Sequence, residues 1–181
     1  MKATGIVRRI DDLGRVVIPK EIRRTMRIRE GEPLEIFTEK DGEVIFKKYS
    51  QVGELGSFAE QYAETLAKTS GYGACITDRD TVIAVSGTPK KDIIEKKISQ
   101  ELDILMEDKI TYASGPNDTK KVAIIDGSDK FNAGVVVPIV AEGDTIGSVI
   151  FFSPDGNANM SEVERKLAIS AAGIKGRQIE G

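Results

Sequence analysis

The sequence lacks histidine and tryptophan, and Cys75 is its one cysteine. Hydrolysis by Ser-His-Asp or Cys-His groups requires an imidazole, a disulfide requires two cysteines, and zinc sites usually take several Cys or His ligands. The shortage of His and Cys also argues against haem ligation, and Cys75 lies in an apolar run where we expect a buried core residue rather than an attachment point. No cofactor and no metal site are therefore expected.

Recognisable catalytic patterns are missing as well. The sequence has no glycine-rich phosphate-binding loop before a helix and no metal-ligand spacing. Asp78 and Asp80 flank a tight turn and are typical of solvated turn residues, and the hydroxyls and lysines of residues 86–91 are typical of turn chemistry. We therefore expect that the protein is not an enzyme and has no catalytic residue.

Long apolar runs are absent too. The longest stretch without a charge covers residues 131–141, which is shorter than the roughly 18 apolar residues that a membrane helix needs. The first residues contain no apolar segment of the kind found in secretory signals. These patterns predict a protein that does not enter a membrane and stays in the cytoplasm.

The charges are distributed unevenly along the 181 residues, a length that allows one domain or two small ones. The net charge is −3, yet residues 1–29 carry nine basic and three acidic groups. Seven of the ten arginines lie in this segment, and the planar guanidinium suits phosphate oxygens and guanine edges. A solvated charged face is the alternative interpretation, but the pattern makes nucleic acid the first partner to consider.

The first 50 residues have the pattern of a small β-rich unit. Apolar and β-branched residues predict strands over 2–10 and 16–18 around a turn, and Pro19 suits the start of a short helix. Two further strands, 34–38 and 44–48, flank Asp41-Gly42, a strong hairpin signal. Because this unit has few large apolar side chains, we expect it to need a second copy, which would place two arginine clusters on one twofold surface that matches pseudo-palindromic duplex DNA.

After a polar link at residues 51–54, residues 55–181 have the pattern of a helix-flanked antiparallel sheet. A capping box at Ser161 and Glu164 marks the start of the last helix, which could lie beside the first helix of this domain. The expected helices cover residues 55–70, 92–107 and 161–179. The expected strands cover residues 72–77, 81–86, 109–113, 121–125, 133–140 and 145–152. The fold class is therefore α+β.

Residues 1–49 closely resemble the AbrB family of transition-state regulators, and the similarity lies in KATGIVRR at 2–9, DLGRVVIPKEIRR at 12–24 and LEI at 34–36. The remainder resembles GAF domains more loosely, through VPIV at 137–140, Gly143-Asp144 and IGSVI at 146–150. An AbrB-like domain followed by a GAF domain is also the order found in a family of sporulation regulators.

The AbrB resemblance implies a swapped-hairpin β-barrel formed by an intertwined dimer that binds double-stranded DNA. Four residues fall where the family places its DNA-contacting arginines: Arg8, Arg15, Arg23 and Arg24. Arg9 and Lys20 are basic neighbours on the same stretch. The resemblance to sporulation regulators implies a homotetramer formed through helices 55–70 and 161–179, and control of genes in the developing spore compartment, by activation or repression.

Two questions stay open at this point. The GAF-like domain is either a sensor that binds an unidentified small molecule within residues 72–155 or a purely structural oligomerisation module. AbrB-like folds also occur in antitoxins, which typically append an extended acidic tail that folds on a toxin. Here the second part of the chain is patterned to fold by itself, which favours the DNA-binding regulator over an antitoxin. The antitoxin is kept as the alternative.

Overall fold

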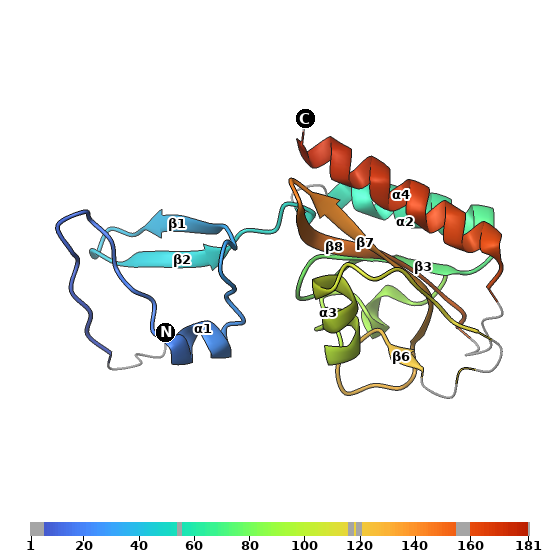
Figure 1. Ribbon diagram of the computed structural model, residues 1–181, viewed down its shortest axis with the longest axis horizontal. Helices are drawn as coiled ribbons and strands as arrows, with labels where there is room; N and C mark the ends of the chain where they lie inside the picture. Colours follow the sequence, from blue (N-terminus) through green and yellow to red (C-terminus); the bar gives the residue numbers. More distant parts are fainter. Residues whose placement is uncertain (1–5, 54–55, 116–117, 119–120, 155–159, 181) are drawn as a thin grey trace. The chain divides into compact units, whose positions relative to one another are not determined.

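The computed structural model describes residues 6–53, 56–115, 118, 121–154 and 160–180. The chain divides into two compact units, Met1–Tyr49 and Ser50–Gly181 (Figure 1). We call them the N-terminal unit and the C-terminal unit. Among the described helices, none has the length and apolar character that crossing a membrane requires.

The N-terminal unit contains one short helix and one hairpin. Helix α1 covers Lys20–Thr25, and strands β1 (Leu34–Thr38) and β2 (Val44–Lys48) pair antiparallel. The turn between the strands contains Gly42 at φ 80°, a conformation that glycine adopts without a steric penalty. The hairpin predicted from Asp41-Gly42 is confirmed.

The strands expected at residues 2–10 and 16–18 are not found in the described part of this segment, residues 6–18. Residues 6–18 contain a turn at 11–14 and no strand, and residues 2–5 lie outside the described part of the chain. A strand requires a neighbouring edge for its hydrogen bonds, and residues 6–18 pair with none of the strands in the described part of the chain. Its apolar side chains are accordingly exposed: Val7, Ile10, Leu13 and Val17 are 68–90% accessible to solvent.

The C-terminal unit is built on a six-stranded antiparallel sheet in the order β4-β3-β8-β7-β5, with β6 also paired to β7. The strands cover Gly73–Thr77 (β3), Val82–Ser86 (β4), Tyr112–Ala113 (β5), Val122–Ala123 (β6), Asn132–Ala141 (β7) and Asp144–Phe152 (β8). The central strands are almost continuously apolar because both faces of the sheet are covered. The expected helix-flanked antiparallel sheet is confirmed.

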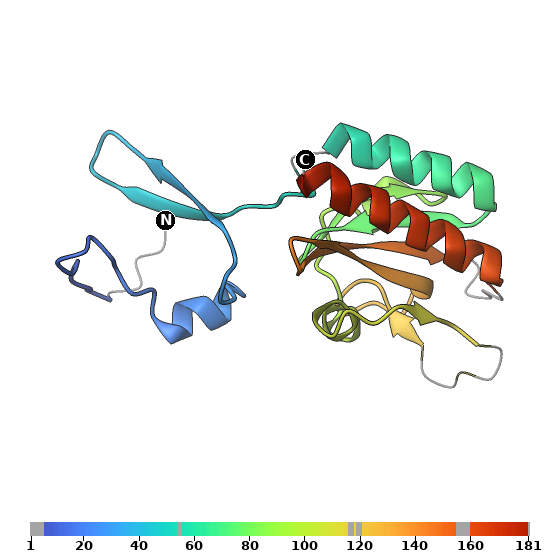
Figure 2. The ribbon, with the colours of Figure 1, turned by 45° about the horizontal axis from the view of Figure 1, so that its top comes forward.

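Two helices lie side by side on one face of this sheet, α2 (Gly56–Ser70) and α4 (Glu162–Glu180) (Figures 1 and 2). They share one hydrophobic cluster with Ile76, Val137 and Phe151. The opposite face packs a second cluster around Cys75, Ile150 and Phe152, beneath helix α3 (Gln100–Glu107). Cys75 is fully buried, as predicted, and burial raises the pKa of its thiol.

The predicted helix over residues 92–107 is wrong in its first half. A 3₁₀ turn covers Lys90–Asp92, and α3 begins only at Gln100, where the Ser99 hydroxyl accepts a hydrogen bond from Leu102 N–H at 3.1 Å. Residues 93–95 form a turn, and the residues after it form isolated bridges, Lys97 with Thr81 and Ile98 with Ile125. Buried Ile98 therefore supplies a sheet contact, although its spacing is also compatible with a helix.

The segment that leads into the C-terminal unit is anchored. The Ser50 hydroxyl donates to Asp78 Oδ2 at 2.9 Å, and Asp78 Oδ1 accepts from the backbone N–H groups of Asp80 and Thr81 in the turn between β3 and β4. Val52, inside the polar stretch 51–54, is fully buried in the cluster beneath α2 and α4. The capping box at the start of α4 is confirmed, because Glu164 Oε2 accepts from Ser161 N–H at 2.6 Å.

Candidate nucleic-acid interface

The turn at residues 11–15 presents Arg15. Gly14 adopts φ 75°, and the Asp11 carboxylate accepts hydrogen bonds from the N–H groups of Leu13 and Arg15. Arg15 Nε also lies 2.8 Å from Asp11 Oδ2, although the side chain remains 71% exposed. The hydrogen bonds from the backbone and side chain of Arg15 lower the pKa of Asp11. The arrangement therefore fixes the base of the Arg15 side chain in a turn while leaving most of it in solvent.

The other five candidate cations are exposed. Arg8 and Arg9 lie in the irregular segment before the turn, and Lys20, Arg23 and Arg24 lie on α1. Among the described residues, none of the five takes part in an ion pair. A cation without a protein partner is available for phosphate, so the structure is compatible with all six sequence-based candidates.

Helix α1 forms because local signals agree. Pro19 precedes it with φ −55°, Glu21 lies in its first turn, and Arg23 and Arg24 lie in its last turn, where positive charge interacts favourably with the helix dipole. No described residue of α1 is buried. The helix consequently exposes Arg23 and Arg24 at its C-terminal end and Lys20 at its start.

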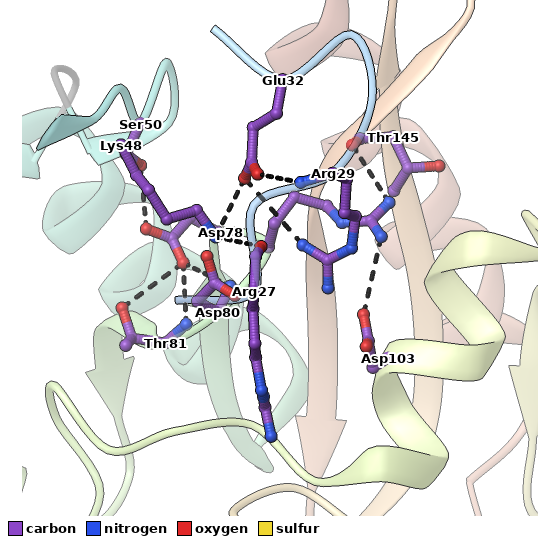
Figure 3. A network of polar contacts seen from close by, with 11 residues as sticks. Arg27, Arg29, Glu32, Lys48, Ser50, Asp78, Asp80, Thr81, Asp103 and Thr145 are labelled. Atoms are coloured by element: carbon purple, nitrogen blue, oxygen red, sulfur yellow. Dashed lines mark hydrogen bonds and ion pairs between the residues drawn. The ribbon is translucent and has the colours of Figure 1, made fainter. Parts of the chain in front are cut away.

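The structure distinguishes exposed cations of the N-terminal unit, such as Arg23 and Arg24, from partly shielded ones, such as Arg29. The sequence did not make this distinction. Arg29 is only 26% exposed, and its backbone N–H donates to Glu32 Oε2 at 2.8 Å (Figure 3). Lys48 Nζ lies 3.0 Å from Glu32 Oε1 and donates to the Arg27 carbonyl at 2.9 Å. Glu32 and Lys48 were missed by sequence reasoning, and only the three-residue spacing of Arg29 and Glu32 signalled part of this network.

Apolar side chains on the N-terminal unit are also exposed. One face of the hairpin carries Leu34, Ile36, Val44 and Phe46, and Ile36 is 62% exposed. The described buried hydrophobic core begins at Val52, so the N-terminal unit contributes nothing to it. An isolated two-stranded hairpin is marginally stable in water, so this apolar face needs to be covered.

Charged side chains of the C-terminal unit make structural contacts. Lys90 pairs with Glu60 at 2.9 Å, and Arg79 lies 3.5 Å from Asp103 on α3. Gly87, in the turn after β4, adopts φ 89°. The described residues contain no group of three or more His, Cys, Asp or Glu side chains arranged to hold a metal ion.

Comparisons with known proteins define the class first. The family described as "Stage V sporulation protein T C-terminal, transcription factor" matches residues 54–180, and the family described as "Antidote-toxin recognition MazE, bacterial antitoxin" matches residues 7–53. The chain is thus a transcription-factor relative with an AbrB-like N-terminal domain and a GAF-like C-terminal domain. It belongs to the stage V sporulation protein T family.

Individual relatives agree with this assignment. The chain is 55% identical over 181 residues to stage V sporulation protein T of Bacillus subtilis (strain 168), covering 99% of each chain. It is 59% identical over 49 residues to the transition state regulatory protein AbrB of the same organism, covering 27% of this chain and 50% of AbrB. The GAF domain of an Acinetobacter phosphoenolpyruvate-protein phosphotransferase, at 11% identity and a TM-score of 0.57, covers 69% of this chain and 81% of that domain and shows the GAF-like fold.

Proposed function

We propose that this protein regulates sporulation genes by binding duplex DNA through exposed cations of an interleaved N-terminal dimer. Arg8, Arg15, Arg23 and Arg24 are the main contacts, and Arg9 and Lys20 flank them. The observation that carries the proposal is the exposure of these six basic side chains in the described N-terminal unit. Five of them have no ion-pair partner among the described residues, and Arg15 is 71% exposed although it pairs with Asp11. The AbrB-like match and the family of transcription factors support the choice of DNA as the partner.

The dimer is supported by the uncovered apolar face of the hairpin. A second copy would cover Ile36 and Phe46 and would offer a strand edge to the apolar segment 6–18, which pairs with no described strand of its own chain. Twofold symmetry would also place both sets of cations on one surface. Such a surface suits a DNA site with two related halves.

The dependence of DNA binding on salt tests the proposal. If a dimer contacts roughly six to eight phosphates, the logarithm of the association constant should fall with the logarithm of salt concentration at a slope of about −5 to −7. Mobility-shift titrations of the full chain on A·T-rich duplex DNA at several salt concentrations measure this slope. Replacing Arg24 with alanine should reduce its magnitude by about one unit per half-site.

Lys96→Ala provides the matched control because Lys96 is an exposed cation of the C-terminal unit. It should leave both the affinity and the slope unchanged. Equal slopes for the wild type and Arg24→Ala would remove Arg24 from the interface. Absence of binding by the wild-type chain at low salt would reject the DNA-binding function.

The C-terminal unit has two roles within this proposal. It joins dimers into a tetramer through α2 and α4, and it adjusts DNA affinity when a small molecule binds within residues 72–155. A metabolite screen by thermal unfolding tests the second role, because a ligand at 100 times its dissociation constant stabilises a protein by about 2.7 kcal/mol. A flat response would favour the oligomerisation role alone.

The antitoxin alternative has one specific observation in its favour, the match of residues 7–53 to the MazE antitoxin family. The residues that follow nevertheless fold into a sheet with two buried clusters rather than an extended tail. Stoichiometric co-purification of a toxin from the native host would favour this alternative.

A further inference from the structure

One acidic side chain, Glu32, ties the segment after α1 to the end of β2. Its Oε2 accepts from the Arg29 backbone N–H, and its Oε1 lies 3.0 Å from Lys48 Nζ (Figure 3). Lys48 also donates to the Arg27 carbonyl at 2.9 Å. The side chains of Glu32 and Lys48 are 12% and 21% exposed, so their hydrogen bonds are largely shielded from water. We call Glu32, Lys48 and the backbone of Arg27 and Arg29 the clamp.

Helix α1 depends on contacts of this kind for its orientation. None of its described residues is buried, so packing contributes little. Its C-terminus is closed by hydrogen bonds from Ile28 N–H to the Arg23 carbonyl at 2.8 Å and from Arg27 N–H to the Arg24 carbonyl at 3.3 Å. These bonds attach α1 to the segment that the clamp holds. The clamp and the bond from Tyr49 N–H to the Pro33 carbonyl, at 3.1 Å, then attach that segment to the hairpin.

We propose that Glu32 and Lys48 are positioning residues for DNA binding. The clamp holds Lys20, Arg23 and Arg24 in the arrangement in which they meet phosphate groups, which lowers the entropic cost of ordering them on the DNA. Neither Glu32 nor the clamped backbone touches DNA. This inference rests on the proposed function and extends it to how the contacting helix is held.

The sign of one substitution separates positioning from simple electrostatics. Glu32→Gln removes a negative charge from a surface that attracts DNA, so a purely electrostatic effect would strengthen binding. If the clamp positions α1, loss of its charge-assisted hydrogen bonds weakens DNA binding instead. We expect about a tenfold loss of affinity for DNA. The salt slope should remain that of the wild type because no phosphate contact is removed.

Glu30→Gln is the matched control. Glu30 is an exposed acidic residue of the same segment, outside the clamp, so its substitution should leave binding unchanged or slightly tighter. Light scattering and thermal unfolding of each variant establish that the assembly and fold are kept. If Glu32→Gln does not fold, Lys48→Gln replaces it in the same titration. Because this change removes a positive charge, the salt slope then takes the place of the sign: a wild-type slope with weaker binding supports positioning, and a reduced slope indicates a lost phosphate contact.

The double variant Glu32→Gln with Lys48→Gln tests the pair. Partners in one clamp should show coupled losses, so the double variant should bind no more weakly than Lys48→Gln alone. Wild-type affinity or tighter binding in Glu32→Gln, or additive losses in the double variant, would overturn the clamp while leaving the proposed function intact. Failure of the wild-type chain to bind DNA would instead reject the proposed function, and the positioning role with it.

Discussion

Arg27 occupies a backbone conformation that usually belongs to glycine. Its φ is 52°, and it follows α1 at the position where many helices end with a left-handed glycine. Arg27→Gly should raise the free energy of unfolding by about 0.5–1 kcal/mol because the strain disappears. Denaturant unfolding of the full chain measures the change.

Arg27→Ala serves as the control, because it removes the guanidinium and retains the strained conformation. The alanine variant should therefore not be stabilised. Identical unfolding midpoints for the glycine and alanine variants would show that backbone strain at residue 27 has no measurable effect.

The six candidate cations could be predicted from the sequence because the resemblance to AbrB regulators aligns them residue by residue. Their contacts with DNA remain a prediction. The distinction between exposed cations and the clamped Lys48 could not be predicted, because it depends on Glu32, which lies sixteen positions away in the sequence and meets Lys48 only when the hairpin folds. A charge count assigns the same value to a free cation and to one in a shielded ion pair.

At the scale of helices and strands, the start of α4 responds to pH. Burial raises the pKa of Glu164, but the hydrogen bonds from Ser161 and from the backbone outweigh this effect and lower it below the ordinary value of 4.5. The stabilisation is therefore fully present above pH 4.5 and is lost as the pH falls through the lowered pKa. Ser161→Ala should cost about 1 kcal/mol at pH 7 and less at pH 3, as measured by chemical unfolding at both pH values. An equal cost at both pH values would contradict a role for the ionised carboxylate.

Two glycines of α4 should respond oppositely to alanine. A Cβ at Gly176 would collide with the Val140 carbonyl of β7, whereas a Cβ at Gly173 meets nothing within 4 Å. Gly176→Ala should lower the free energy of unfolding by about 1–3 kcal/mol, and Gly173→Ala should raise it by about 0.5–1 kcal/mol. Thermal unfolding of both variants measures the difference, and stabilisation by Gly176→Ala would show that α4 does not pack closely on β7.

Elements with local signals could be predicted from the sequence, and elements that depend on distant partners could not. The hairpin at Asp41-Gly42 and the capping box at Ser161 are specified by residues within one turn. The extended segment before α3 is specified instead by bridges to Thr81 and Ile125, so helical periodicity at Ile94 and Ile98 gave the wrong element. The apolar run at 6–18 has β character but pairs with no strand among the residues that the structure describes.

At the scale of the whole molecule, self-association should depend on the apolar face of the hairpin. Ile36 is 62% exposed in one chain, so Ile36→Asp would be nearly neutral in a monomer. In an interleaved dimer, the same change buries a charge and should cost about 2–3 kcal/mol of dimer stability. Light scattering over a dilution series measures the shift toward smaller species.

Ile104→Asp is the comparison, because Ile104 is 50% exposed on α3 in the other unit. It should leave the mass unchanged. An unchanged mass for Ile36→Asp as well would indicate that this face of the hairpin is not part of the association surface.

Val52 sets a limit on how the protein can be divided. Its side chain is fully buried beneath α2 and α4, although it precedes the first helix of the C-terminal unit and lies just before the region matched by the sporulation family. A fragment starting at Gly56 would lack this side chain and would leave an unfilled hollow in the interior. Fragments for crystallisation or ligand screening should therefore begin no later than Ser50, so that they retain the buried Val52 side chain.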